Sequence, residues 1–272
     1  MCIYRFDRDF PTGNDPHPVD RPLRYDTTAH VITQGLGQNR NTFPGGVLCD
    51  GCNAYFGKKL EPALLVHPTL AYDMQRLGVP GKDGRPRPLL ANWRRASDGA
   101  CEVPMAPLEQ RGEHNGRPVV VILPILDPGF DQGRFRRALH MLAFNVLAYG
   151  QRGHAQGWDY DPHNPKFDAV RAYIRAPRRP NEAWPLVERY DPPREGGKVG
   201  VQLFSSDEGL MGRIRAYSFE FYVDLLNTGN LLSWVQSEGI TSARLIPPGT
   251  RYPASPTMDE VPPDRRGWLR LN

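Results

Sequence analysis

The chain has 272 residues, a net charge of +4 and an isoelectric point near 8.9. Its mean hydropathy is −0.54, and no apolar run approaches the roughly 20 residues of a membrane-spanning helix, so we expect a soluble protein without a membrane partner. The first ten residues carry acids and lack the apolar stretch of a secretion signal, so we expect a cytoplasmic protein with reduced thiols. The mild excess of positive charge is compatible with a nucleic-acid partner.

Two short strands open the first predicted unit, which spans residues 1–78. Residues 2–6 and 29–33 favour extended structure, and the segment between them is a loop rich in proline and aspartate. Glycine and asparagine in residues 35–46 indicate a further loop and turn. The unit therefore begins with two strands joined and followed by loops.

Helices complete this unit. Residues 52–65 predict the first helix, because the leucines in this segment form an apolar stripe at helical spacing. Residues 67–78 predict a second helix that stops at Gly78. The unit ends there, and residues 79–88 follow as a basic linker rich in glycine and proline.

The remainder of the chain, residues 89–272, predicts a larger α+β domain. Its expected strands are an antiparallel pair at residues 198–204 and 212–226 and a buried strand at 117–126. Its expected helices are at residues 133–150 and 167–175. One face of the longer helix carries apolar residues, which are Phe135, Leu139, Leu142, Val146 and Tyr149. His140 and Asn145 on this helix are either a second polar site or the polar edge of a buried face. The proline-rich tail from residue 247 predicts irregular structure.

The candidate functional residues are a single histidine, His30, and a Cys-x-x-Cys-Asn motif at residues 49–53. In a cytosolic chain, a Cys-x-x-Cys indicates a metal or redox site more often than a disulfide. A strand-borne histidine that faces Asn53 at the start of a helix would suit metal-dependent hydrolysis. The histidine can accept a proton from the attacking water, while oxygen ligands hold a cation such as Mg²⁺ against the phosphate.

Residues 28–84 resemble the HNH endonuclease family, whose members share a ββα-metal core. The branch that this segment resembles reads roughly CxxC, EHVIPxxLGG and CxxCNxxFG, and the corresponding segments here are CIYR, AHVITQGLGQ and CDGCNAYFG. The resemblance implies a small N-terminal HNH-like ββα-metal module that binds zinc, followed by the larger α+β domain with its antiparallel sheet and long helix. It also implies that the protein hydrolyses phosphodiester bonds in nucleic acid, with DNA as the expected target.

The resemblance assigns catalytic roles position by position. His30 matches the general base, and Asn53 matches the metal-binding residue at the start of the helix. Asn41 or Asn39 matches the middle asparagine, which braces the loop. The implied cofactor is a divalent cation, Mg²⁺ or Mn²⁺, with Asn53 among its ligands.

A structural zinc site is implied by the cysteines. Cys49 and Cys52 match its second half and Cys2 matches its first half, but Arg5 stands where the family has the other cysteine of the first pair. A structural zinc requires four ligands. The missing one is either His17 or Cys101, or else the site is a metal-free remnant.

A second departure affects the catalytic ion. Ala29 stands where the family has an acidic ligand, and Asp26 does not replace it, because three residues along a strand place it roughly 10 Å away on the other face. Two hypotheses follow: a diverged endonuclease in which His30 still activates water, and a catalytically inactive protein that binds nucleic acid or another partner. A third interpretation is an α+β protein with a structural zinc and no role in nucleic-acid chemistry.

Basic residues flank the predicted core on both sides. Lys58, Lys59, Lys82 and Arg85 are the candidate contacts to phosphate, and such contacts weaken as the salt concentration rises. A solvated basic surface is an equally simple interpretation. The sequence is compatible with a homodimer and does not fix the oligomeric state.

Overall fold

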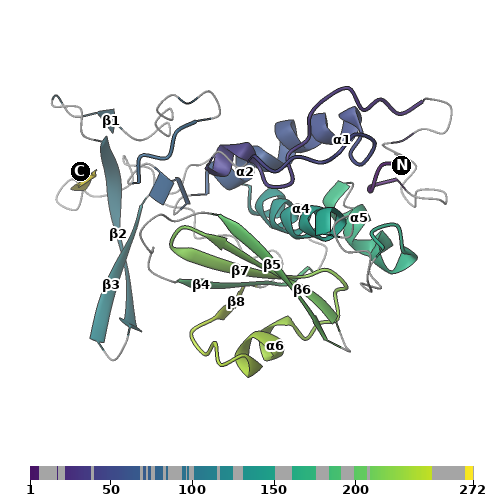
Figure 1. Cartoon of the computed structure of the whole chain (residues 1–272). Coiled ribbons are helices and arrows are strands. Elements are labelled where there is room, and N and C mark those ends of the chain that lie inside the picture. The colour runs from purple at the N-terminus through teal and green to yellow at the C-terminus, as the bar shows by residue number, and fades with distance from the viewer. Residues whose placement is uncertain are drawn as a thin grey trace.

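A five-stranded antiparallel sheet and a 19-residue helix form the centre of the protein (Figure 1). The computed structural model describes residues 1–5, 17, 22–37, 40–67, 70–71, 73–74, 77–81, 84, 94–95, 97, 101–114, 117–124, 131–150, 161–175, 184–190, 199–206, 209–246 and 267–271. In this part of the chain, no helix is both long enough and apolar enough to cross a membrane. The described residues form an α+β fold, as the sequence predicts.

The five strands of the central sheet lie in the order β5-β6-β7-β4-β8, and every neighbouring pair is antiparallel. They are β4 (Leu186–Tyr190), β5 (Gly200–Ser206), β6 (Gly209–Ala216), β7 (Phe219–Asp224) and β8 (Arg244–Ile246). The predicted antiparallel pair is confirmed as β5 and β6. The second predicted strand is in fact two, because a turn at Tyr217 and Ser218 folds β7 back onto β6, with Tyr217 at a φ of 54°.

Helix α4 (Gln132–Gly150) lies between this sheet and the N-terminal helices (Figure 1). The sequence predicts a single apolar face, whereas every residue from 135 to 145 is buried. The reason is that β5, β6 and β7 cover one side of the helix while α2 (Glu61–Leu65) covers another. The two ends of the helix leave the core: Arg134 is exposed in the first turn, and Tyr149 is 39% exposed in the last.

Two shorter helices cover the remaining faces. Helix α5 (Asp168–Arg175), which follows a 3₁₀ turn at η3 (Pro165–Phe167), packs on α4 and confirms the second predicted helix of this region. Helix α6 (Leu231–Ser237) packs on the opposite face of the sheet, where a second cluster of buried apolar residues contains Met211 and Tyr222. The sequence patterns did not predict α6, β4 or β8.

The predicted helix at residues 52–65 is confirmed as one continuous helical run. It consists of α1 (Asp50–Tyr55), the π-helical segment η2 (Phe56–Leu60) and α2, and it buries Leu60 and Leu64 completely. Beyond it, the described residues 70, 71, 73 and 74 are also helical. Gly78 has a φ of +61°, a conformation that favours glycine and ends the helical region as predicted.

Both predicted N-terminal strands are wrong. Residues 2–5 form a turn, closed by a 2.9 Å hydrogen bond from the Arg5 amide to the Cys2 carbonyl. Residues 29–33 contribute only a single antiparallel bridge, between His30 and Thr42, before the 3₁₀ turn η1 (Gln34–Leu36) begins. Apolar residues in these segments indicate burial correctly, but within the described residues their pairing stops at this one bridge and does not extend into a ladder.

A separate antiparallel sheet contains β1 (Arg94–Arg95), β2 (Cys101–His114), β3 (Arg117–Pro124) and β9 (Gly267–Leu271). Strand β3 confirms the predicted strand at 117–126, and it pairs with β2, which was not predicted. Strand β9 corrects the expectation of an irregular tail, because residues 267–271 pair with residues 101–105 of β2.

One cluster of buried apolar residues joins the N-terminal residues to α4 and the central sheet. The Tyr4 ring lies 4.8 Å from the ring of Phe56 and 5.3 Å from that of Phe144. The described residues of the predicted linker, 79–81 and 84, lie outside helices and strands. A domain boundary at 79–88 stays a prediction.

Candidate metal centre and the surroundings of His30

Three cysteines and one histidine meet at the N-terminal end of the protein. The Sγ atoms of Cys2, Cys49 and Cys52 and a ring nitrogen of His17 all lie within 4.8 Å of one another. His17 Nε2 is 3.2 Å from the Sγ atoms of both Cys49 and Cys52, and all four residues are buried. The cluster could therefore hold a metal ion such as zinc.

Local backbone contacts explain how residues far apart in sequence reach this cluster. The amide of Ile3 donates a 2.9 Å hydrogen bond to the carbonyl of Val47, which places Cys2 beside the start of α1. Cys49 is the N-cap of α1, and its carbonyl accepts the Asn53 amide at 2.9 Å. Cys52 follows within the first turn of the same helix, so the Cys-x-x-Cys spacing directs both thiols to one side.

The donor set fits zinc. A tetrahedral zinc with bonds of roughly 2.0–2.3 Å places neighbouring ligand atoms about 3.5–3.8 Å apart, and three cysteines with one histidine are a common structural zinc site. The sequence leaves the fourth ligand open between His17 and Cys101, and the structure brings His17 to the cysteines. The side chain of Cys101 lies outside the described residues.

The electrostatics of the cluster favour a cation. Hydrogen bonds with Cys2 and Cys52 hold the pKa of Cys49 far below its ordinary value, whereas burial raises the pKa of Cys52. Burial lowers the pKa of His17, but hydrogen bonds and charge from Cys2 and Cys49 outweigh it and raise this pKa to about 9. Without a metal the imidazole therefore holds a proton against a thiolate, and zinc would take the place of that proton.

His30 is half-buried and forms the antiparallel bridge with Thr42. Next to this bridge, the Val31 amide donates a 2.9 Å hydrogen bond to the carbonyl of Asn41. The backbone of Asn41 thus braces the loop between these residues, while its side chain is exposed. Asn39, the alternative middle asparagine, lies outside the described residues.

Asn53 lies on α1 and faces the chain just before His30. Its Nδ2 donates hydrogen bonds to Thr27 Oγ1 at 3.1 Å and to the Thr28 carbonyl at 3.3 Å. The structure therefore brings Asn53 close to the segment that carries His30.

Thr27 and Asp50 join Asn53 in a polar network that the sequence patterns did not reveal. Thr27 Oγ1 donates a 2.7 Å hydrogen bond to the Asp50 carboxylate, which also accepts the amide of Thr27 at 2.9 Å. These bonds, those of the Thr27 side chain first, hold the pKa of Asp50 below its usual value, so the group remains a carboxylate. The sequence signal for this network was the spacing of Asp50 and Asn53, which are three residues apart and therefore lie on one face of the helix.

The position of Ala29 offers no ligand for a catalytic ion. Ala29 is only 3% exposed, and its carbonyl accepts the Phe43 amide at 2.8 Å. Within the described residues, the Cys2–His17–Cys49–Cys52 cluster is the one group of at least three His, Cys, Asp or Glu side chains placed to share a metal. Near Asn53 the described residues add only the Asp50 carboxylate, which Thr27 already engages, so a catalytic Mg²⁺ or Mn²⁺ stays a prediction.

Of the predicted phosphate contacts, Lys58 and Lys59 are exposed on η2. Lys82 and Arg85 lie outside the described residues. The π-helical geometry of η2 is rare and often occurs at functional sites. Two adjacent lysines on this segment, a few residues after Asn53, give the N-terminal unit an exposed positive charge.

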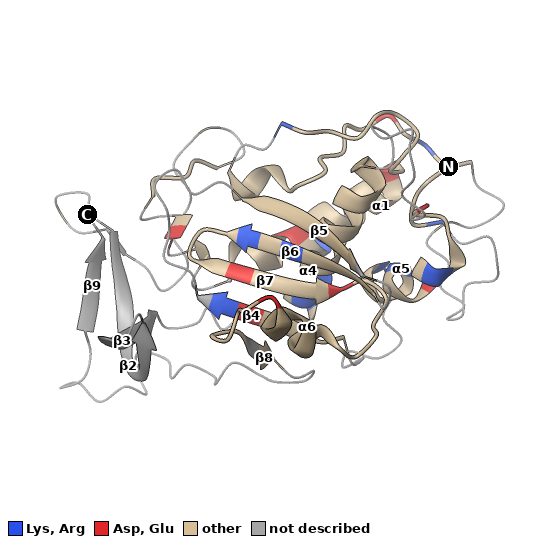
Figure 2. Ribbon diagram, turned by 60° about the horizontal axis from the view of Figure 1, so that its bottom comes forward, with Lys and Arg blue, Asp and Glu red and all other residues tan. Residues whose placement is uncertain are grey.

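A second charged cluster lies on the central sheet. Figure 2 shows blue bands on β6 and β4 to either side of a red band on β7. Glu220, which is fully buried, pairs with Arg213 and Arg189 and accepts a 2.8 Å hydrogen bond from the Tyr222 hydroxyl. Burial raises the pKa of Glu220, but these partners outweigh it and lower the pKa overall. The cluster joins three strands and explains how a carboxylate is tolerated in the sheet.

The two polar residues singled out on the long helix are buried. Asn145 accepts a 2.9 Å hydrogen bond from the Tyr4 hydroxyl, and its Nδ2 donates to the Val31 carbonyl at 3.3 Å. His140 packs against the rings of Tyr173 and Trp184, each 5.2 Å away. Both residues therefore take part in the packing of α4 against its neighbours.

Comparison with protein-family models, with curated proteins and with solved structures gives no match for this chain. The likeness to the HNH family therefore rests on the residues of the chain itself. What the structure adds is their placement: a Cys/His cluster at the start of α1, with Asn53 directed at the segment that carries His30.

Proposed function

We propose that the chain is an HNH-type protein that acts on nucleic acid, and that it hydrolyses phosphodiester bonds with His30 as the general base. One observation carries the proposal. His30 pairs across a loop with Thr42, and the helix that follows presents Asn53 to Thr28 while its first turn carries two thiols of the Cys/His cluster. A histidine, an asparagine-bearing helix and a metal-ordered turn are the parts that such a module requires.

The roles in this proposal belong to residues of the chain. Zinc at the Cys/His cluster would tie the residue 2–5 turn to α1 and supply rigidity. His30 would accept the proton of the attacking water. Lys58 and Lys59 would attract the phosphate backbone, a contribution that falls as salt is added.

A second candidate function is nucleic-acid binding without cleavage, and Ala29 favours it. A buried methyl group replaces the carboxylate that would hold the catalytic ion. Loss of such a ligand removes several kcal/mol of transition-state stabilisation, which corresponds to orders of magnitude in rate. Because the described residues establish no ligand set for that ion, we assign no step of the reaction to it.

Nicking of supercoiled plasmid separates the two candidates. The purified protein is incubated with Mg²⁺, Mn²⁺ or EDTA, alongside His30→Ala and the surface control Gln236→Ala, which is exposed on α6. Metal-dependent nicking that is lost only in His30→Ala supports hydrolysis. Gel retardation of DNA without nicking by any of the three proteins supports binding alone.

Salt dependence tests the nucleic-acid role itself. Lys58→Ala combined with Lys59→Ala should weaken DNA binding and reduce its dependence on salt, whereas Lys166→Ala, a lysine exposed on η3, should not. An absence of DNA and RNA binding by the zinc-loaded wild-type protein at low salt would reject both candidates.

A further inference from the structure

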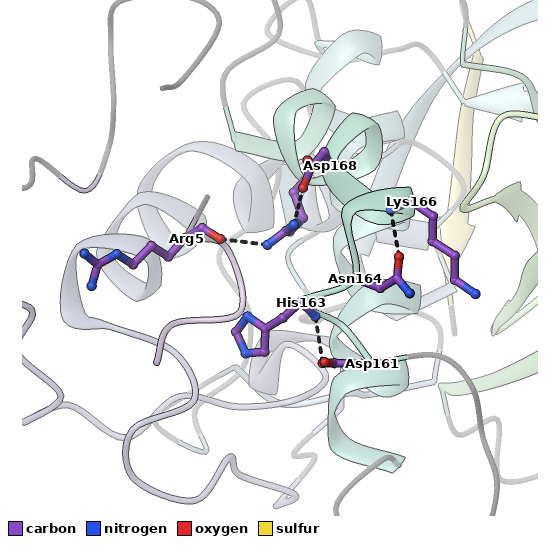
Figure 3. A network of polar contacts seen from close by, with 7 residues as sticks. Arg5, Asp161, His163, Asn164, Lys166 and Asp168 are labelled. Carbon is purple, nitrogen blue, oxygen red and sulfur yellow. Dashed lines mark hydrogen bonds and ion pairs between the residues drawn. The ribbon is translucent and has the colours of Figure 1, made fainter. Parts of the chain in front are cut away.

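Arginines on α5 contact Cys52 of the candidate metal centre and the turn that carries Cys2. Arg175 Nε donates a hydrogen bond to Cys52 Sγ, with a nitrogen–sulfur distance of 3.4 Å. One turn earlier, Arg171 Nη1 donates a 2.7 Å hydrogen bond to the Arg5 carbonyl, and the same side chain pairs with Asp168. Figure 3 shows the Arg5 carbonyl at one end of this contact and Asp168 at the other. Helix α5, about 120 residues from Cys52 in sequence, therefore contacts both the turn that carries Cys2 and the thiol of Cys52.

The position of Arg175 is fixed by more than the sulfur. Its guanidinium carbon lies 4.0 Å from the centroid of the Tyr55 ring, which is a cation–π distance. The Tyr55 hydroxyl in turn accepts a 3.1 Å hydrogen bond from Arg137 Nη1 on α4. Tyr55 and Cys52 are three residues apart on the same helix, so one guanidinium contacts both. The sulfur and the ring together fix the position of the guanidinium.

The contact between Arg175 and Cys52 places a positive charge beside the metal centre. Three thiolates and one neutral imidazole around Zn²⁺ leave a net charge of −1, and all four ligand residues are buried. Burying an unpaired charge is unfavourable, and a nearby cation that also donates a hydrogen bond to the anion relieves most of that cost. Arg175 supplies both the cation and the hydrogen bond.

We infer that Arg175 is an outer-sphere positioning residue of the metal centre, which orients the Cys52 thiolate, offsets the excess negative charge of a Cys₃His–zinc site and thereby retains the metal. The inference rests on the zinc site of the proposed function. It adds that metal retention depends on α5, a helix outside the N-terminal unit. Partners of this kind around metal sites typically change metal affinity by about 10–100-fold when they are removed.

The test measures zinc, not catalysis. Zinc affinity and the rate of zinc transfer to a chromogenic chelator are compared for the wild-type protein, Arg175→Met, Arg175→Lys and Arg134→Met. Arg134 is a control arginine at the start of α4, exposed and paired with Asp131 away from the cluster. We expect Arg175→Met to weaken zinc binding by about 10-fold or more. The zinc affinity of Arg175→Lys should fall between those of wild type and Arg175→Met, because lysine keeps the positive charge and loses the stacked planar group.

Equal zinc affinity in Arg175→Met, Arg134→Met and wild type would overturn the inference and leave the zinc site intact. A wild-type protein that binds no zinc would overturn the metal centre and this inference together. If Arg175→Met does not accumulate in folded form, wild type and Arg175→Lys are compared with Co²⁺ in place of zinc. Arg175→Lys removes the Nε donor that contacts Cys52 Sγ. A hydrogen bond to sulfur stabilises its lone pair, so the thiolate-to-cobalt charge-transfer band should move to lower energy in this variant. An unchanged band would again overturn the inference.

Discussion

The N-terminal unit and the helix–sheet unit, by which we mean α4, α5 and the five-stranded sheet, are held together in different ways. From residue 22 to 49 the described chain contains one isolated β-bridge and one 3₁₀ turn. The helix–sheet unit contains four adjacent strand pairings and a helix that is buried on both sides. Regular hydrogen-bond ladders hold the helix–sheet unit together, whereas the Cys/His cluster connects the loops of the N-terminal unit.

The two units therefore depend on different interactions for their stability. Loops lack the cooperative hydrogen bonds of sheets, and a metal or other crosslink commonly replaces a large core in small loop-rich units. The N-terminal unit does share apolar contacts with α4, through Tyr4 and Phe56 among others. Its fold should nevertheless depend on the metal far more than the sheet does.

Removal of zinc should destabilise the N-terminal unit more than any single substitution. Structural zinc binds small domains with roughly 10–16 kcal/mol of apparent free energy, most of which is folding free energy. In hydrogen exchange after chelation, residues 22–57 should lose protection while strands β5, β6 and β7 keep theirs. Equal loss of protection in both units would show that they unfold as one body and do not differ in their need for metal.

Ligand variants check that the effect comes from the assigned cluster. His17→Asn should abolish stoichiometric zinc binding, because it removes one of four buried ligand atoms. Cys101→Ser should retain zinc, since His17 already completes the set. Retention of zinc by His17→Asn together with its loss in Cys101→Ser would reverse the assignment of the fourth ligand.

Acid should destabilise the protein through two buried histidines, His140 on α4 and His67, whose ring lies 4.3 Å from that of Phe135 on the same helix. Burial lowers the pKa of His67 to about 3. Burial also lowers the pKa of His140 to about 4: the backbone hydrogen bond to Arg136 raises this pKa, and the charge of Arg136 lowers it further. An unfolded histidine has a pKa near 6.5, so the unfolded state binds more protons below that pH, and stability is lost as the pH falls from 6.5 toward 4.

His140→Phe isolates this contribution. Each histidine should cost about 1.4 kcal/mol per pH unit in this window, so between pH 7 and pH 5 the wild type should lose roughly 2 kcal/mol more than the variant. The measurement is urea unfolding at several pH values, followed by tryptophan fluorescence. Any acid release of zinc occurs in both proteins and cancels in the comparison. Parallel pH profiles for the two proteins would contradict the prediction.

The two units also differ in how well sequence patterns predict them. Helical spacing correctly predicts α1 to α2, α4 and α5, and β-branched runs predict β3, because local patterns dictate these elements. The same patterns misread residues 2–6 and 29–33 as strands, since no neighbouring strand in the described part of the chain pairs with them. The reach of His17 to the cysteines and the contact of Arg175 with Cys52 depend on tertiary folding, which no local pattern encodes.

Gly212 tests the close packing of α4 on the sheet. A Cβ at this position would lie 2.6 Å from the Cβ of Ala143 on α4 and 3.1 Å from Cγ2 of Val223 on β7. Gly212→Ala should therefore destabilise the protein by about 1–3 kcal/mol, the usual cost of overpacking, in denaturant unfolding. The matched control is Gly200→Ala on β5, where nothing lies within 4 Å of the added atom, and it should be close to neutral. A neutral Gly212→Ala would mean that α4 shifts freely on the sheet.

The smallest predicted effect concerns the hydrogen bond that links the two units. The Tyr4 hydroxyl donates to Asn145 Oδ1 at 2.9 Å, and both groups are buried. Tyr4→Phe should destabilise the zinc-loaded protein by about 1 kcal/mol, the typical net value of such a bond. A double-mutant cycle with Asn145→Ala, read by denaturant unfolding, isolates the pairwise term from the other contacts of these residues. If the metal holds the N-terminal unit against α4, this coupling energy should be present with zinc and fall toward zero without it. The same coupling in both states would show that Tyr4 docks on α4 by packing alone, and that zinc orders the loops but does not attach them.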